Sequence, residues 1–115
     1  MVSAESKSHK FDLEDRTTDF AKQVIILCRL LKREPINDRL SGQITGSAGS
    51  IGANYREAND ALGKKDFLHR LKISRKETKE TIHWLELILT ANPSLNDEIE
   101  KLTVEANELK KSSRQ

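Results

Sequence analysis

The chain has 115 residues, of which 33% are charged and 4% aromatic, and a formal net charge of +2. This length suits one domain with a small core, and the composition favours a helical bundle over a β-sandwich. No apolar run is long enough to cross a membrane, and we expect no secretory signal. A single cysteine, Cys28, excludes an internal disulfide and suits a reducing cytoplasm, which we predict as the location.

The first predicted helix covers residues 13–32 and follows a polar segment, residues 1–10, that we expect to be a disordered tail. Asp12 resembles its N-cap. A stripe of residues at steps of three and four indicates the buried face: Leu13, Thr17, Phe20, Val24, Leu27 and Leu31. Ile26 and Leu30 lie off this stripe. They indicate either a second buried contact, for example with another subunit, or ordinary exposed apolar residues.

The second helix is predicted over residues 37–62, after a break at Glu34-Pro35 and before Gly63. Its inward stripe is Leu40, Ile44, Ala48, Ile51, Tyr55, Ala58 and Leu62. Small residues share another face: Gly42, Gly46, Gly49 and Ala53. Because each helical glycine costs about 0.8–1 kcal/mol relative to alanine, we interpret this face as a tight packing seam for another helix. The substitution Gly49→Leu should then be severely destabilising. A phosphate-binding loop is the alternative, but no strand precedes the glycines.

The third helix is predicted over residues 65–90 and the fourth up to residue 109, after a turn at residues 92–94. Ser94 and Asp97 resemble a capping box for the fourth helix. Residues 111–115 should form a frayed tail, which leaves residues 11–110 as the folded domain. Four helices with short connections predict an all-α, up-down-up-down antiparallel four-helix bundle.

The third helix also carries a line of cations opposite its apolar stripe. At about 100° per residue, one outward line holds Lys65, His69, Lys72, Lys76, Lys79 and His83. Residues 64–79 contain seven Lys or Arg against two acidic residues, a local net charge of +5, whereas residues 92–109 have five acidic residues against one Lys, a net charge of −4.

This line has two interpretations. It is either a phosphate-binding ridge or a solvated polar face. Under the first, the candidate nucleic-acid-binding residues are Lys65, Lys72, Lys76, Lys79 and Arg75. No aromatic residue is interleaved with the lysines, so stacking of single-stranded bases is not indicated. Binding should therefore be to a phosphate backbone or to an acidic protein.

Self-association is the second predicted property. Ile73, Trp84 and Leu87 lie to one side of the core stripe of the third helix, and tryptophan is favoured at interfaces. Together with Ile26 and Leu30 they form the predicted oligomer interface. The alternative for Trp84 is a partly buried residue of the bundle.

No set of residues indicates catalysis, and we expect no cofactor, no metal and no enzymatic activity. The pair Glu80 and His83 has the spacing of a di-iron motif, but such sites need two pairs and further carboxylates pointing inward. Cys28 fits a small core residue better than a nucleophile. Asn54 and Arg56 follow the glycines without a complementary acid, base or metal cluster, so we assign them a structural role.

Residues 50–58, Ser-Ile-Gly-Ala-Asn-Tyr-Arg-Glu-Ala, resemble the signature of the bacterial four-helix bundle proteins encoded in intervening sequences of 23S ribosomal RNA genes. Residues 11–17, 66–73 and 80–87 resemble further segments of that family, so the likeness spans about residues 11–110. The resemblance implies a ring-like homopentamer. It also implies distant similarity to the accessory variability determinant of diversity-generating retroelements, which contacts a reverse transcriptase and RNA.

From these features together we expect a non-enzymatic, oligomeric four-helix bundle that binds nucleic acid or a nucleic-acid enzyme through the third helix. The alternative is a purely structural or protein-interaction module without nucleic-acid contact, in which basic and acidic helices pair between subunits.

Overall fold

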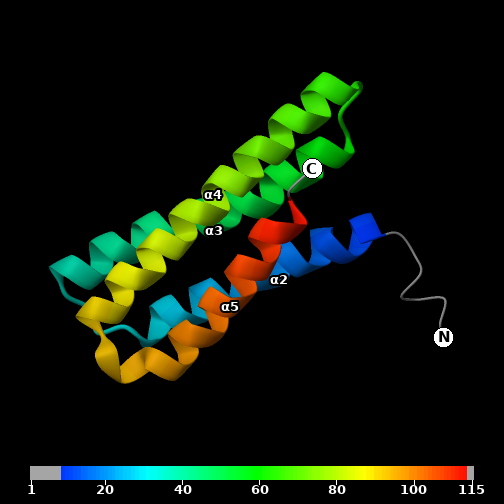
Figure 1. Cartoon of the computed structure of the whole chain (residues 1–115). Helices are drawn as coiled ribbons and strands as arrows, with labels where there is room; N and C mark the ends of the chain where they lie inside the picture. Colours follow the sequence, from blue (N-terminus) through cyan, green and yellow to red (C-terminus); the bar gives the residue numbers. More distant parts are fainter. Residues whose placement is uncertain (1–8, 114–115) are drawn as a thin grey trace, which may run out of the picture.

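The computed structural model describes residues 9–113 and is built from four α-helices and one short 3-10 helix. In chain order these are α2 (His9–Leu30), α3 (Pro35–Asn59), α4 (Lys64–Ala91), η1 (Pro93–Leu95) and α5 (Asn96–Ser112). Successive α-helices run in opposite directions and are joined by short connections (Figure 1). The predicted all-α, up-down-up-down bundle is confirmed.

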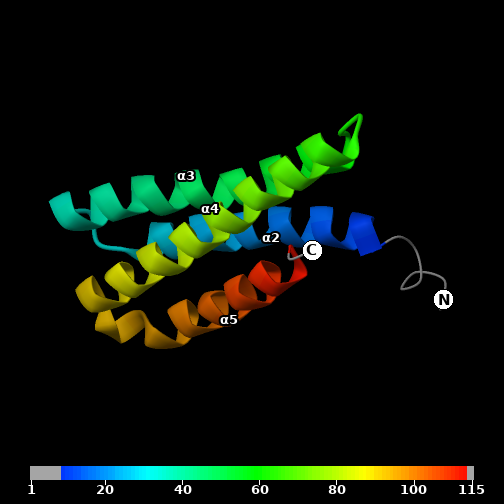
Figure 2. The same cartoon turned by 45° about the horizontal axis from the view of Figure 1, so that its top comes forward.

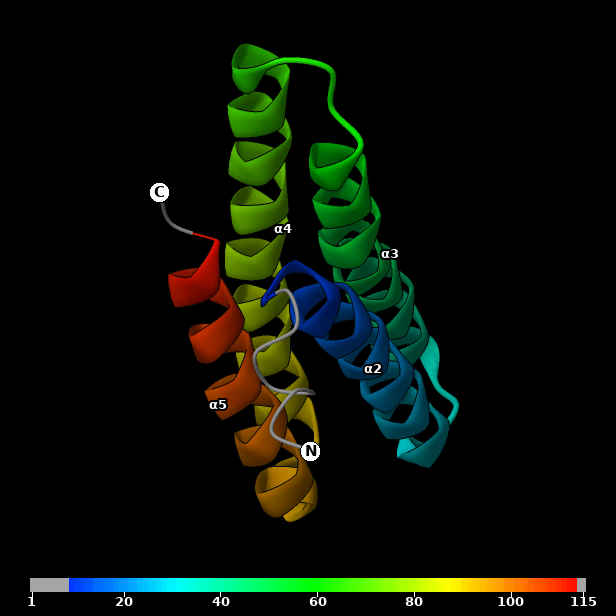
Figure 3. The ribbon, with the colours of Figure 1, turned by 90° about the vertical axis from the view of Figure 1, so that its right-hand side faces the viewer.

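The α3–α4 hairpin is the backbone of the molecule. Its two helices share the most extensive contact, whereas α2 packs mainly on α3 and α5 mainly on α4. Contact between α2 and α5 is much smaller, and α2 and α4 are not packed as neighbours. Figure 2 shows α3 along the top and α5 along the bottom of the bundle, with α2 and α4 between them, and Figure 3 shows the connected end of α3 and α4 projecting beyond α2 and α5.

The core follows the apolar stripes read from the sequence. All six residues of the first stripe are buried, five of them in α2 and the sixth, Leu31, directly after it. Val24, Ile44, Leu85 and Ile88 are fully buried at the centre of the bundle. Apolar burial at roughly 25 cal/mol per Å² supplies the main stabilising free energy of such a bundle.

Several helix ends differ from the prediction. Because α2 begins at His9, Asp12 lies inside the helix and is not its N-cap. Helix α3 ends at Asn59, and Gly63 instead precedes α4 in an extended conformation. Leu62, predicted to face inward, therefore lies in the connection and is fully exposed. Ser94 lies in η1, and no side chain caps the start of α5, so the predicted capping box does not form.

The predicted tails lie largely outside the described residues, which exclude residues 1–8 and 114–115. At the C-terminal side, α5 continues to Ser112, two residues past the predicted end of the bundle. Together with Asp12, Gly63 and Ser94, these bounds show that residue types typical of helix ends located the ends less well than the apolar stripes located the helices.

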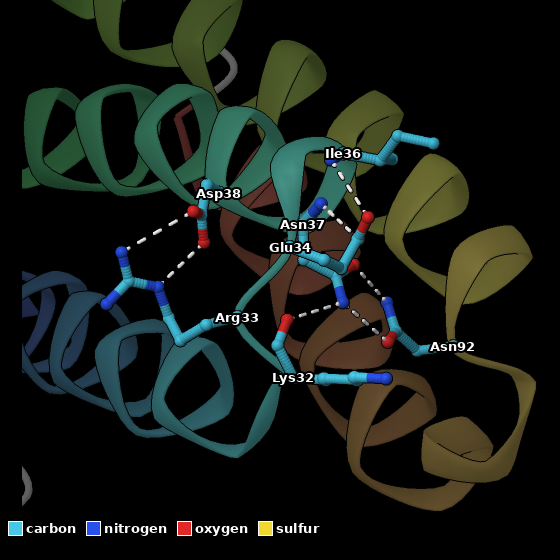
Figure 4. Close-up of polar contacts among 7 residues, drawn as sticks. All are labelled: Lys32, Arg33, Glu34, Ile36, Asn37, Asp38 and Asn92. Carbon is cyan, nitrogen blue, oxygen red and sulfur yellow. Dashed lines mark hydrogen bonds and ion pairs between the residues drawn. The ribbon is translucent and has the colours of Figure 1, made fainter.

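A polar cluster closes the end of the bundle where α2 meets α3 (Figure 4). The Glu34 carboxylate accepts hydrogen bonds from the backbone N–H groups of Ile36 at 3.1 Å and Asn37 at 2.6 Å, which caps α3. The side chains of Asn37 and Asn92 exchange two hydrogen bonds, at 3.2 and 2.9 Å. This exchange ties the start of α3 to the end of α4, and the Asn37 amide also donates to the Lys32 carbonyl at 3.0 Å.

The predicted glycine seam is wrong within the chain. We call Gly42, Gly46, Gly49 and Ala53 the glycine face. All four residues of this face are exposed, and a Cβ placed on any of its three glycines would meet no atom within 4 Å. Ile44 and Ile51, on the other side of α3, are buried in the core. The glycine face therefore points away from the bundle, and no helix of the same chain packs on it.

Close helix packing occurs at other small residues of α3. A Cβ on Gly52 would lie 2.9 Å from Thr17 Oγ1 and 3.3 Å from Thr17 Cβ, so any larger residue there would force Thr17 of α2 to move. Between α3 and α4, buried hydroxyl groups replace large side chains. Ser47 and Thr81 share a hydrogen bond of 2.8 Å, and Ser74 donates to the Ile51 carbonyl at 2.9 Å. Close packing of α3 thus occurs at these contacts and not at the glycine face, where it was predicted.

Candidate nucleic-acid interface

The outward side of α4 carries the row of cations predicted from the sequence. We call this row the basic ridge, and its members are Lys65, His69, Lys72, Lys76, Lys79 and His83. All six are exposed. The opposite side of α4 is fixed in the core by residues such as Leu71 and Leu85, which are buried. Because one side of the helix is held inward, the ridge must face solvent along most of α4.

Arg75 takes a different position from the other predicted nucleic-acid-binding residues. It is half-buried at the side of the ridge, and its Nε is buried without a hydrogen-bond partner among the described residues. A solvent-open hollow of about 390 Å³ is lined by Lys72, Arg75, Lys76, Lys79, Glu80 and His83. The half-buried Arg75 and the exposed lysines thus line the same hollow.

The ridge cations are not neutralised by ion pairs within the described part of the chain. The ion pairs there join Arg16 to Glu105, Arg33 to Asp38, Arg56 to Glu14 and Lys111 to Glu108. None includes a ridge residue. A row of unpaired cations produces a positive potential that attracts polyanions and speeds their association.

Two other charged residues of α4, Glu77 and Arg70, are half-buried. Glu77 is half-buried, and its pKa is raised by burial and by the neighbouring Glu80, against the opposing effect of Lys76. Arg70 is drawn away from the ridge because its Nη1 donates to Asn54 Oδ1 at 3.2 Å. Asp66, Glu80 and Glu86 are also exposed on α4, so the four ridge lysines outnumber the exposed carboxylates of this helix by one.

Among the described side chains, no Trp, Tyr or Phe ring is exposed beside the ridge. Trp84 is half-buried against the core, with its ring centroid 4.9 Å from that of His83 at an interplanar angle of 58°. Phe67 also packs against the core, and Phe20 and Tyr55 are buried. The ridge can therefore contact phosphates, but apart from the imidazoles of His69 and His83 its described side chains offer no exposed ring on which bases could stack.

The predicted oligomer interface falls on two separate parts of the molecule. Ile26 and Leu30 are each 54% exposed on α2, beside a small groove next to α5. Ile73 and Trp84 on α4 are half-buried, and Leu87 is 39% exposed. Because α2 and α4 are not packed as neighbours, the five residues do not form one patch on a single chain.

The segment that resembles a family signature has a structural role, as predicted. Arg56 Nη1 lies 3.1 Å from Glu14 Oε1, and its Nη2 donates to Thr18 Oγ1 at 2.9 Å. Asn59 donates to the other Glu14 oxygen at 2.6 Å. These bonds attach the end of α3 to the start of α2. Tyr55, in the same segment, is buried in the core, and burial raises the pKa of its phenol.

Sequence reasoning missed the acidic partners of these links. Glu14 is central to the α2–α3 contact, and Glu105 on α5 accepts two hydrogen bonds from Arg16, at 2.9 and 2.8 Å. Both partners are more than 40 positions away along the chain. No local spacing rule connects residues at that separation, so only the packed helices reveal the pairs.

Other chemistry has little support in the described residues. No group of three or more His, Cys, Asp or Glu side chains between residues 9 and 113 is placed to hold a metal ion. Glu80 and His83 are both exposed on α4. Cys28 is half-buried, with its Sγ 3.8 Å from Thr45 Oγ1. Within the same residues, no helix combines the length and apolar character needed to span a membrane.

Comparison with known proteins supports the resemblance carried by residues 50–58. The model of the 23S rRNA-intervening sequence protein family matches residues 9–114. A protein of unknown function from the S23 ribosomal protein family of Bacteroides thetaiotaomicron has a crystal structure that matches this fold with a TM-score of 0.77. The sequences of the two chains are 32% identical. That match covers 88% of this chain and 94% of the other. No curated protein matches the chain significantly.

Proposed function

The chain belongs to the 23S rRNA-intervening sequence protein family, and from that premise we propose that it is a non-enzymatic, oligomeric protein that binds nucleic acid or a nucleic-acid-processing enzyme. The observation that carries this proposal is the basic ridge, six exposed basic residues in one row without ion pairs among the described residues. We assign the contact to Lys65, Lys72, Lys76 and Lys79, with Arg75 at the side.

The energetics of the proposed contact come from counterion release. Each phosphate neutralised by a lysine frees condensed cations, so affinity depends steeply on salt and little on sequence. A single ridge with about four lysine contacts binds weakly at physiological salt. Several ridges in one assembly would raise the affinity by avidity, without any new kind of contact.

We further propose that the assembly is a ring, and the homopentamer implied by the family resemblance fits this arrangement. The apolar residues of α2, Ile26 and Leu30, lie apart from the partly exposed apolar residues of α4, such as Leu87. Two different patches on one chain favour head-to-tail contacts, in which the α2 side of one copy meets the α4 side of the next. Contacts of this kind generate rings when the rotation closes. The single cysteine is consistent with a cytoplasmic location.

The experiment is solution mass by light scattering, with and without a mixed pool of RNA and DNA at low and moderate salt. We expect a multiple of 13.1 kDa that gains mass with nucleic acid at low salt. The double variant Lys72→Glu/Lys76→Glu should keep the oligomer and lose the gain in mass. A matched control, Lys22→Glu/Lys32→Glu, makes the same charge change on exposed lysines outside α4 and should retain most binding.

Two outcomes would contradict the proposal. Binding that survives reversal of the ridge lysines would place the contact elsewhere. An oligomer that ignores nucleic acid at low salt but dissociates as salt rises would favour the alternative, in which α4 and the acidic α5 pair between copies as a protein-interaction module.

A further inference from the structure

We propose that the basic ridge prefers double-stranded over single-stranded nucleic acid. The inference rests on the proposed function and specifies its ligand: a duplex read through its phosphate backbone. Three features of α4 support it, namely its straight course, the chemistry of its outward side chains and the absence of stacking surfaces.

The first feature is the shape of the ridge. Helix α4 is continuous from Lys64 to Ala91 (Figure 2), so Lys65 and His83 are about 27 Å apart along its axis at ~1.5 Å per residue. A duplex is stiff on this scale and carries one charge per ~1.7 Å of axis. It presents phosphates to a straight row of cations without being ordered first. A flexible single strand must lose conformational freedom to follow the same row, which reduces its net affinity.

The second feature is that the ridge acts through charge. Binding by counterion release falls with salt at a slope of about −0.9 per contacted phosphate for a duplex and about −0.7 for a single strand. For about four lysine contacts, lowering the salt concentration tenfold from 1 M raises log Kobs for the duplex by ~0.8 more than log Kobs for the single strand. With equal affinities at 1 M salt as the reference, the ridge should bind a duplex about six-fold more tightly than a single strand at 0.1 M salt.

The third feature removes the usual compensation for single strands. Proteins that bind single strands gain about 1–3 kcal/mol for each base stacked on an aromatic side chain. Trp84 is the aromatic residue beside the ridge, but it is half-buried, packs against the core and has His83 against its ring. Bases splayed from a single strand would find lysine side chains and the small imidazole rings of His69 and His83, but no exposed Trp, Tyr or Phe ring among the described side chains.

The test is fluorescence anisotropy of the intact oligomer with three labelled probes: a 24-base-pair DNA duplex, a 24-base-pair RNA duplex and a 24-residue oligothymidylate. Titrations between 50 and 200 mM KCl give both affinity and salt slope. We expect one or both duplexes to bind about six-fold more tightly than oligothymidylate near 0.1 M KCl, beyond the two-fold advantage of having two strands. The two duplex probes then distinguish B-form from A-form geometry.

The control variants make the result specific to the ridge. Lys72→Glu/Lys76→Glu should lower the affinity for duplex and lower the salt slope by about 2, whereas Lys22→Glu/Lys32→Glu should leave the duplex preference intact. Equal or tighter binding of oligothymidylate overturns the duplex preference while leaving nucleic-acid binding in place. No binding of any probe at 50 mM KCl overturns both this inference and the proposed function, and would turn attention to an acidic protein partner.

Discussion

The outward faces of α3 and α4 show what a periodic pattern does and does not determine. Both faces were identified from residues spaced at three and four positions, and both point away from the bundle. On α4 the row of lysines is exposed, as expected for charged side chains. On α3 the glycine face was expected to be buried, yet its glycines meet nothing within 4 Å. Spacing shows which residues share a face, but only side-chain chemistry shows which face is inward.

Glycine carries less of that information than any other residue, because it has no side chain to bury or to solvate. Gly52, which packs against Thr17, is turned around the helix axis by about 60° from Gly49 and about 100° from Ala53, both of which are exposed. The contrast between Gly49 and Gly52 can therefore be tested directly by substitution.

The largest effect should come from Gly52→Leu. A Cβ at this position would already lie 2.9 Å from Thr17 Oγ1, and the remaining side chain would separate α2 from α3. We expect a loss of about 3 kcal/mol or more in the free energy of unfolding, measured by urea denaturation followed by circular dichroism. Unchanged stability would mean that α2 and α3 are not in close contact at this point.

The next largest effect should come from Glu14→Ala. This change leaves Arg56 and Asn59 without their shared carboxylate, which is partly buried. The expected loss is about 1–3 kcal/mol, because unpaired polar groups at a packed contact lose their compensation for desolvation. Urea denaturation gives the magnitude, and the double variant with Arg56→Ala should cost less than the sum of the two single changes. Strict additivity would argue against a coupled Glu14–Arg56 contact.

A smaller effect, of opposite sign, is expected from Gly49→Ala. In the single chain this face is open, so the substitution should stabilise the helix by up to about 1 kcal/mol. Measuring the unfolding free energy at several protein concentrations also tests whether a second copy covers the glycine face. A stabilised monomer with a weakened oligomer would place the glycines at a subunit contact. A destabilised monomer would restore the intrachain seam that the structure excludes.

The smallest effect on folding should come from Lys72→Glu/Lys76→Glu. Both side chains are exposed and form no ion pair among the described residues. The free energy of unfolding should change by less than about 0.5 kcal/mol for each site. Thermal unfolding by circular dichroism checks this, and a large loss of stability would mean that these lysines are structural and that the double variant does not test binding.

Much of the fold was predictable because apolar residues at helical spacing have one favourable place in a small bundle. The stripe from Leu13 to Leu31 is buried as expected. Helix ends were less predictable. Gly63 and Ser94 are typical capping residues, yet the chain leaves α3 at Asn59 and enters α5 through a 3-10 turn. Gly63 is instead the N-cap residue of α4, and no side chain caps α5, so these residue types alone did not locate the helix ends.

The candidate site was predictable in part for the same reason. Lysines opposite a buried stripe must face solvent, which fixed the position of the ridge. Arg75 was harder to place because an arginine stem can lie along apolar surface while its head remains polar. The position of the interface residues Ile26 and Trp84 on separate parts of the bundle depends on helix order in space, which spacing along one helix does not contain.

The central claim is that the basic ridge binds phosphates, and the most direct test is the salt slope of duplex binding in the wild type and in Lys72→Glu/Lys76→Glu. With about four phosphate contacts per ridge, the slope of log Kobs against log[KCl] should be about −3.6 or steeper for the wild type. In the variant the slope should be about half as steep. Equal slopes and equal affinities for the two proteins would contradict the claim.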